Sequence, residues 1–132
     1  MNFEFKVEHI GVGARDSVAL KDWYVRVLSG EVLYQTPNTP PAFLLRLPGG
    51  LILEIYAAKD LSDLVGNNQL NGWRHLALRV NNIEKAREAL EKNGVAISEP
   101  IKPAGGGGRV LFFNDPDGNL LHLVERMENC DF

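Results

Sequence analysis

The sequence predicts an α+β fold made of two tandem copies of one β-α-β-β-β module. Each copy opens on a histidine-bearing strand pattern, VEHIGV at 7–12 and WRHLAL at 73–78, and continues into a helix-like stretch that ends in glycine. Each copy closes on a strand pattern, GGLILEIY or DGNLLHLVE, with a glycine four residues ahead of a polar side chain. This repeat predicts a single domain over 1–132, with module 1 at about 3–58, a connector at about 59–72, module 2 at about 73–126 and a tail at 127–132.

In the first copy, apolar and polar residues alternate over 3–12, which predicts a strand. Asp16 can cap the following helix, and Gly30 is placed to end it. Helical spacing puts five apolar residues on one face of that helix: Leu20, Trp23, Tyr24, Val27 and Leu28. Short apolar runs separated by proline and glycine then predict strands at 31–35, 42–47 and 51–57.

The second copy begins after a polar connector at 61–72 with a strand at 75–80. An asparagine-capped helix is predicted over 81–94, with Ile83, Ala86 and Leu90 on its apolar side and Gly94 as its stop. Three more strands are predicted, at 95–100, 109–113 and 119–125, and Asp115-Pro116-Asp117-Gly118 is a strong turn sequence before the last one. The glycine run at 105–108 is read as a flexible connector, or alternatively as a mobile flap over a site.

Composition narrows the classes of partner. With 132 residues, 45% hydrophobic residues and a net charge of −3, the chain suits one soluble globular domain. The absence of a clustered basic stretch argues against nucleic acid as a partner. The N-terminal residues lack the long apolar run of a signal peptide or a membrane span, so no membrane partner and a cytoplasmic location are expected.

Four residues at matching places in the two copies are candidate metal ligands: His9, Glu54, His75 and His122. They include all three histidines of the chain, and imidazole with carboxylate is a usual donor set for zinc, iron, nickel or manganese. The competing interpretation is structural, since a lone histidine in a strand is usually a packing residue and Glu54 could be paired with Arg46 or Arg79. Three histidines on equivalent strands favour the metal.

Strand alternation predicts which residues share the ligand face. The residues next to the ligands in sequence face the other side of the sheet, and they are apolar, as expected for a face packed on a helix. The residues that share the ligand face are predicted to line a largely apolar cavity: Ile52, Tyr56, Ala77, Arg79, Leu120 and Val124. Arg79 and Tyr56 are therefore candidate substrate-binding residues. Arg79 ranks before Arg46, Arg74 and Arg109 as the group that would hold a substrate carboxylate or phosphate, against the common alternative that it is a solvated or salt-bridged surface residue.

VEHIGV, LILEIY, WRHLALRV and FFNDPDGNLLHLVE together make the chain resemble the vicinal oxygen chelate superfamily, from about residue 6 to residue 126. This superfamily includes glyoxalase I, extradiol dioxygenases and bleomycin-resistance proteins. The resemblance implies paired βαβββ modules whose curved mixed sheet encloses a cavity, with His9, Glu54, His75 and His122 as ligands of one divalent ion. It also implies a homodimer, because modules from two chains complete each site in several members.

One departure from the glyoxalase I pattern concerns the base. The last-strand ligand is a glutamate in glyoxalase I, whereas this chain has His122. Glu54 is then the remaining carboxylate and the candidate catalytic base, with metal-bound water as the alternative. Glu125 lies an odd number of residues from His122 and should face the other way.

The leading functional hypothesis is a metal-dependent isomerase or lyase of glyoxalase type. It would act on a small substrate with neighbouring oxygens, by proton abstraction and a metal-stabilised enediolate. The alternatives are an iron-dependent ring-cleaving dioxygenase, and a metal-free small-molecule (antibiotic) binding protein of bleomycin-resistance type. The metal could be zinc, nickel, iron, cobalt or manganese, and the substrate and any dependence on glutathione stay open.

Overall fold

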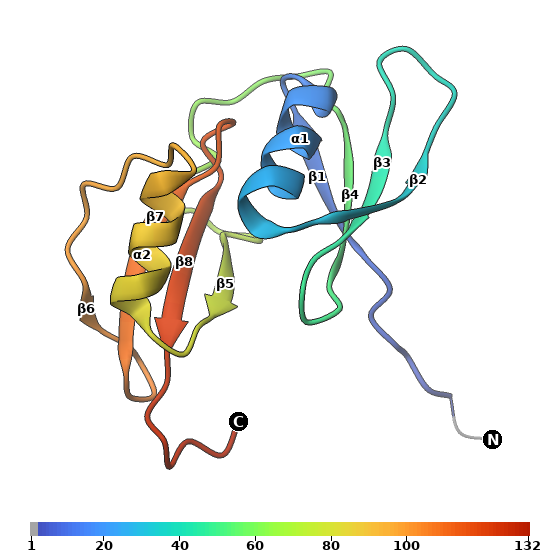
Figure 1. Ribbon diagram of the computed structural model, residues 1–132. Helices are drawn as coiled ribbons and strands as arrows, with labels where there is room; N and C mark the ends of the chain where they lie inside the picture. Colours follow the sequence, from blue (N-terminus) through green and yellow to red (C-terminus); the bar gives the residue numbers. More distant parts are fainter. Residues whose placement is uncertain (1–2) are drawn as a thin grey trace. The chain divides into compact units, whose positions relative to one another are not determined.

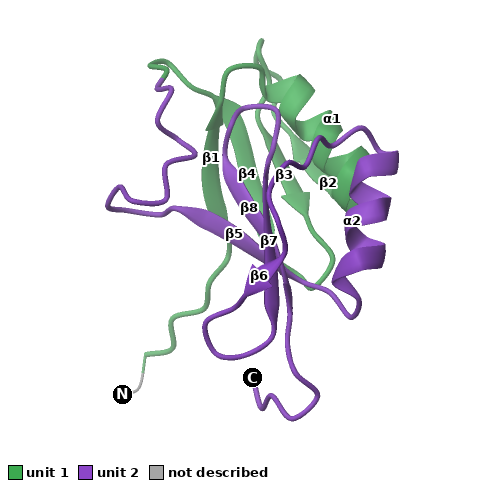
Figure 2. Ribbon diagram, turned by 90° about the vertical axis from the view of Figure 1, so that its left-hand side faces the viewer, with its two compact units in different colours: residues 1–61 green, residues 62–132 purple. Residues whose placement is uncertain are grey.

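The computed structural model describes residues 3–132 and divides the chain into two compact units. Unit 1 ends at Leu61, and unit 2 spans Ser62–Phe132 (Figure 2). Each unit repeats the order strand, helix and three strands (Figure 1), which confirms the predicted α+β class and the tandem βαβββ modules. Within residues 3–132, neither helix is long and apolar enough to cross a membrane.

Unit 1 is a four-stranded mixed sheet with one helix on it. Its elements are β1 (Ile10–Ala14), α1 (Ser17–Leu28), β2 (Glu31–Gln35), β3 (Phe43–Arg46) and β4 (Ile52–Ala57). The strand order is β1-β4-β3-β2, with β1 parallel to β4 and the other pairs antiparallel. Trp23 and Tyr24 of α1 are buried, as are Leu45 and Ile55, so α1 and one face of the sheet form the core of this unit.

Unit 2 repeats this plan with β5 (His75–Arg79), α2 (Ile83–Lys92), β6 (Lys102–Pro103), β7 (Arg109–Asn114) and β8 (Leu120–Glu125). The strand order is β5-β8-β7-β6, again with a parallel first pair. Ile83 and Leu90 of α2 are buried, together with Leu111 and Leu121 of the sheet. In both units the central strand β4 or β8 therefore has one face against a helix and one face turned away from it.

Capping residues set the start of both helices as predicted. The Asp16 carboxylate accepts a hydrogen bond from the Ala19 N–H, and the Asn82 amide oxygen accepts one from the Lys85 N–H. The end of α1 differs from the prediction, because Ser29 takes the left-handed conformation at φ 58° and Gly30 does not. Gly30 serves packing instead, since a Cβ there would lie 2.9 Å from Cδ2 of Leu45.

Two of the predicted strands were wrong, one in its extent and one in its existence. The strand predicted over 3–12 begins only at Ile10, and the apolar residues of its first part, Phe3, Phe5 and Val7, are exposed. The strand predicted over 95–100 does not form, and the short β6 follows it at Lys102–Pro103. Val95 is nevertheless buried. The alternation there correctly indicated that Val95 faces inward, but the segment lacks the ladder of backbone hydrogen bonds that defines a strand.

The glycine run at 105–108 is a hydrogen-bonded hairpin turn between β6 and β7, in place of the loose connector or flap that the glycines predict. The guanidinium of Arg126 donates to the carbonyls of Gly105 and Gly107. Gly108 has φ 96°, and a Cβ there would collide with the Glu125 carbonyl. Glycine at 108 is thus required by close backbone packing and by its dihedral angle.

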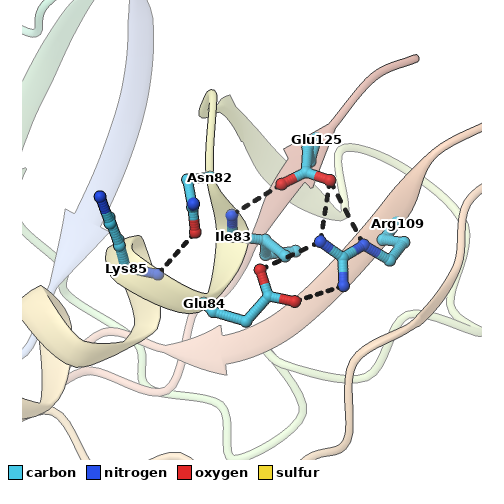
Figure 3. Close-up of polar contacts among 6 residues, drawn as sticks. All are labelled: Asn82, Ile83, Glu84, Lys85, Arg109 and Glu125. Carbon is cyan, nitrogen blue, oxygen red and sulfur yellow. Dashed lines mark hydrogen bonds and ion pairs between the residues drawn. The ribbon is translucent and has the colours of Figure 1, made fainter.

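An ion cluster joins α2 to the sheet of unit 2 (Figure 3). The Arg109 guanidinium donates to both carboxylate oxygens of Glu84, at 2.5 and 3.0 Å, and to Glu125 at 2.9 Å. The second oxygen of Glu125 accepts from the Ile83 N–H at the first turn of α2. Glu125 therefore faces α2 and points away from His122, which confirms the predicted orientation. The Arg109 guanidinium is bound in this structural cluster.

We expect this cluster to make the folded protein acid-sensitive. The hydrogen bonds from Arg109 hold the pKa of Glu84 below the usual 4.5. The pKa of Glu125 is also held below 4.5, first by the hydrogen bond from the Ile83 N–H and then by those from Arg109. Below pH 4.5 the unfolded chain therefore binds more protons than the folded protein does. The stability that this cluster contributes is present above that pH and is lost as the pH falls through the lowered pKa values.

Arg109→Met should reduce this loss of stability in acid, measured as the change in the urea midpoint between about pH 6 and about pH 3. The exposed Lys92→Met is the matched control. An acid dependence in Arg109→Met equal to that of the wild type would contradict the assignment.

Candidate metal centre

The two histidines of unit 2 lie side by side on the sheet face opposite α2. In the parallel pair of β5 and β8, His75 is in register with Leu120, and Ala77 with His122. The two imidazole ring centroids are 4.8 Å apart. Phe112 of β7 is directly opposite His122, with its ring centroid 4.8 Å from that imidazole. The sequence prediction that His75 and His122 share one face is confirmed within this unit.

The turn before β8 fixes where this strand begins. The Asp115 carboxylate is buried and accepts hydrogen bonds from the backbone N–H groups of Asp117 and Asn119 and from the Asn119 side chain. Gly118 takes φ 91°, the conformation for which glycine is suited. The turn therefore sets the register that puts His122 on the sheet face opposite α2.

Both imidazoles of unit 2 have their Nδ1 atoms against oxygen acceptors. His75 Nδ1 lies 2.8 Å from the Asn68 amide oxygen, and His122 Nδ1 lies 3.3 Å from the Leu123 carbonyl oxygen. Because neither oxygen can donate, a hydrogen bond to it forms in the neutral ring only when Nδ1 carries the proton. The Nε2 atom of each neutral ring then keeps its lone pair.

Burial keeps His122 in this neutral form. Its residue is 8% exposed, and burial lowers the pKa of His122 below 6.5. The nearby His75 and Arg126 act in the same direction, and the hydrogen bond to the Leu123 carbonyl opposes them. His122 is thus an uncharged donor at neutral pH, the form that binds metal ions.

In unit 1, Glu54 occupies the equivalent face of β4. It is in register with Gly11 of β1 and with Leu44 of β3. Its carboxylate oxygen lies 4.0 Å from the position a Gly11 Cβ would take, and the Tyr56 ring lies 3.4 and 3.5 Å from the corresponding positions of Gly11 and Gly13. The two glycines leave room for the Tyr56 ring beside Glu54, on the face away from α1.

His9 lies immediately before β1, two residues ahead of Gly11. Its Nδ1 lies 2.7 Å from a carboxylate oxygen of Glu8, so this nitrogen also donates to an oxygen and Nε2 stays free in the neutral ring. All three histidines thus show the arrangement common among metal-binding histidines, in which one nitrogen donates to an oxygen and the other is open. In this respect the residues present fit a divalent ion.

Each unit contains two of the four candidate ligands: His9 and Glu54 in unit 1, and His75 and His122 in unit 2. Among residues 3–132 there is no group of three or more histidine, cysteine, aspartate or glutamate side chains that could hold a metal ion. The assembly of all four residues into one centre therefore stays a prediction.

The candidate arginines are engaged elsewhere. Arg79 donates to the Phe132 carbonyl in the tail, and Arg46 lies 3.5 Å from Glu31. Within unit 1, the ion pair of Arg46 is therefore with Glu31 and not with Glu54, as one form of the structural interpretation required. Arg74 donates to the Asn67 carbonyl at 3.1 Å. A substrate-binding role for Arg79 stays a prediction, and it would require the guanidinium to leave the tail.

Sequence reasoning missed the oxygen partners of the histidines and the Phe112 ring beside His122. Glu8 had a signal, because a carboxylate directly precedes His9. Phe112 could have been placed opposite His122 by pairing the last two strands across the DPDG turn. Asn68 had no signal, since it lies in a connector whose composition only predicts a turn.

Parallel strand pairs with histidine or glutamate on the face away from a helix, repeated in two βαβββ units, define the class of protein. The chain belongs to the glyoxalase/bleomycin resistance protein/dioxygenase superfamily, whose family model matches residues 6–123. It is 30% identical over 124 residues to the Bacillus subtilis (strain 168) protein YwkD, covering 91% of this chain and 96% of that protein.

Two further comparisons agree with this membership. The chain is 28% identical over 111 residues to lactoylglutathione lyase of Escherichia coli O157:H7, covering 81% of this chain and 82% of that protein. The crystal structure of a glyoxalase family protein from Enterococcus faecalis matches with a TM-score of 0.77 and 30% identity, over 91% of this chain and 97% of that one. Both similarities extend across the two units.

Proposed function

We propose that this protein is a metal-dependent isomerase or lyase of glyoxalase type. The observation that carries the proposal is that Nδ1 of each of the three histidines lies within 3.3 Å of an oxygen acceptor. In this arrangement Nδ1 holds the proton and Nε2 is left for a ligand. The similarity to a protein named lactoylglutathione lyase supports the reaction class. The substrate in this proposal is a small molecule with two neighbouring oxygens.

In this proposal His9, Glu54, His75 and His122 hold one divalent ion, which is zinc, nickel, iron, cobalt or manganese. The bound ion would supply a Lewis acid for the two substrate oxygens. Glu54 accepts the proton from the carbon beside the carbonyl at a carboxylate oxygen. Tyr56 lies beside that carboxylate and positions the substrate.

Residues around these groups favour a small apolar substrate with one charged end. Ile52, Ala77 and Leu120 lie on the candidate ligand faces and would exclude water. Arg79 would hold a carboxylate or phosphate of the substrate, an oxygen acceptor like the one it binds in the tail. We further propose that the protein is a homodimer and is located in the cytoplasm. Sedimentation of the purified protein tests the dimer.

The experiment that tests this function is the metal content of the untagged native protein, measured by elemental mass analysis. We expect about one divalent ion per chain, and its loss in the His75→Ala, His122→Ala double variant. Iron as the native metal would favour the ring-cleaving dioxygenase. No metal, even after supplementation with zinc, nickel, manganese and ferrous iron, would overturn the proposal and favour a metal-free binding protein.

A further inference from the structure

Asn68 lies in the connector between the two sheets and contacts one of the candidate ligands. Its amide oxygen lies 2.8 Å from Nδ1 of His75. The Phe112 ring meets the same imidazole edge to face, at a centroid distance of 6.2 Å and an interplanar angle of 84°. The ring of His75 is therefore held by a polar contact and by an aromatic one.

The connector that carries Asn68 has a defined place in unit 2. A Cβ at Gly66 would lie 2.5 Å from the Gly118 carbonyl oxygen, so the connector backbone lies directly on the turn before β8. The Arg74 guanidinium donates to the Asn67 carbonyl at 3.1 Å. The Asn67 side chain in turn accepts from the Gln69 N–H at 3.0 Å. These contacts on both sides of Asn68 fix the backbone from which its amide reaches His75.

We propose that Asn68 is a positioning residue, which fixes His75 in the Nδ1–H tautomer and so makes Nε2 the ligand nitrogen. The amide oxygen can only accept, so the hydrogen bond exists only when Nδ1 carries the proton. A partner of this kind sets the tautomer and the ring orientation of a metal-binding histidine. The part of this proposal that concerns metal affinity rests on the proposed function, whereas the tautomer is a property of the metal-free chain.

The first test is the tautomer of His75, read from the imidazole nitrogen shifts in long-range ¹H–¹⁵N spectra at about pH 8, above the ordinary histidine pKa. We expect the Nδ1–H form in the wild type. Asn68→Leu removes the acceptor at similar size and should move His75 toward the Nε2–H form, whereas Asn68→Asp keeps an oxygen acceptor and should retain the wild-type tautomer. Gln69→Ala, in the same connector, is the matched control. A wild-type Nε2–H form, or an unchanged tautomer in Asn68→Leu, would overturn the proposal.

The second test is the affinity for zinc, titrated calorimetrically into the full-length metal-free protein. Asn68→Leu should bind zinc about 10- to 100-fold more weakly, and Asn68→Asp should restore most of this loss. An unchanged affinity in Asn68→Leu, with wild-type protein that does bind zinc, contradicts the role of Asn68 and leaves the proposed function standing. A wild-type protein that binds no metal contradicts the proposed function, and the tautomer then decides the role of Asn68.

Discussion

Glu54→Gln is expected to lower turnover by about 10²- to 10⁴-fold while the protein keeps its metal. Glutamine has nearly the same size as glutamate and retains an oxygen that can remain near the ion, but it cannot accept the substrate proton. Glu54 suits the role of base because it is half-buried on the sheet face away from α1, beside the Tyr56 ring. Arg46, which lies on the same face of the sheet, is paired with Glu31.

Turnover can be followed as exchange of the proton beside a carbonyl for deuterium, by proton NMR in deuterated water. Lactoylglutathione and a glutathione-free hydroxyketone are the two probes, so that a dependence on glutathione becomes visible. Metal content is measured on the same samples, with the exposed Glu99→Gln as the control. Equal losses of metal and of turnover in Glu54→Gln would sink the base assignment and make Glu54 a ligand only.

The elements that sequence could predict are those specified by local chemistry. Both helices start where a side-chain oxygen caps the first turn, at Asp16 and Asn82. The strand β8 starts where Asp115 and Gly118 make the turn. Once β8 was placed, alternation alone put His122 on one face and Glu125 on the other.

The strand errors have a different origin. Alternation over 3–9 and 95–100 predicts strands, although the pattern itself only describes an extended chain with two unlike faces. Phe5 is 94% exposed and Val95 is 7% exposed, yet neither lies in a strand. Whether an extended segment joins a sheet depends on a neighbour elsewhere in the chain, and that information is not local.

The candidate site also contains some residues that local patterns predict and others that depend on distant parts of the chain. Placing His75 and His122 together needed only the parallel pairing of the first and last strands of a module. The partner of His75 depends on how the connector lies against a distant turn, through the approach of Gly66 to the Gly118 carbonyl. Such contacts between two glycines leave no periodic signal, so Asn68 could only be identified from the structure.

His122→Glu is expected to make the stability of the folded protein strongly dependent on metal. Wild-type His122 is buried and has a lowered pKa, so it is neutral without an ion and its burial carries no charge. A glutamate in its place, beside Phe112 and His75, would carry a buried charge that the nearby Arg126 offsets only in part, at a cost of about 3–5 kcal/mol. The metal-free variant should therefore melt roughly 10 °C below the wild type.

Zinc should reverse most of this loss, because a carboxylate is a zinc ligand and the ion neutralises the buried charge. Binding at about 100 times the dissociation constant adds about 2.7 kcal/mol to any variant that binds. His122→Ala is the control, since it loses the donor without adding a charge and should gain little from zinc. Thermal melts of the three proteins with and without zinc measure the effect. If His122→Glu gains no more from zinc than His122→Ala does, residue 122 does not face a metal, and its pairing with His75 is a packing contact.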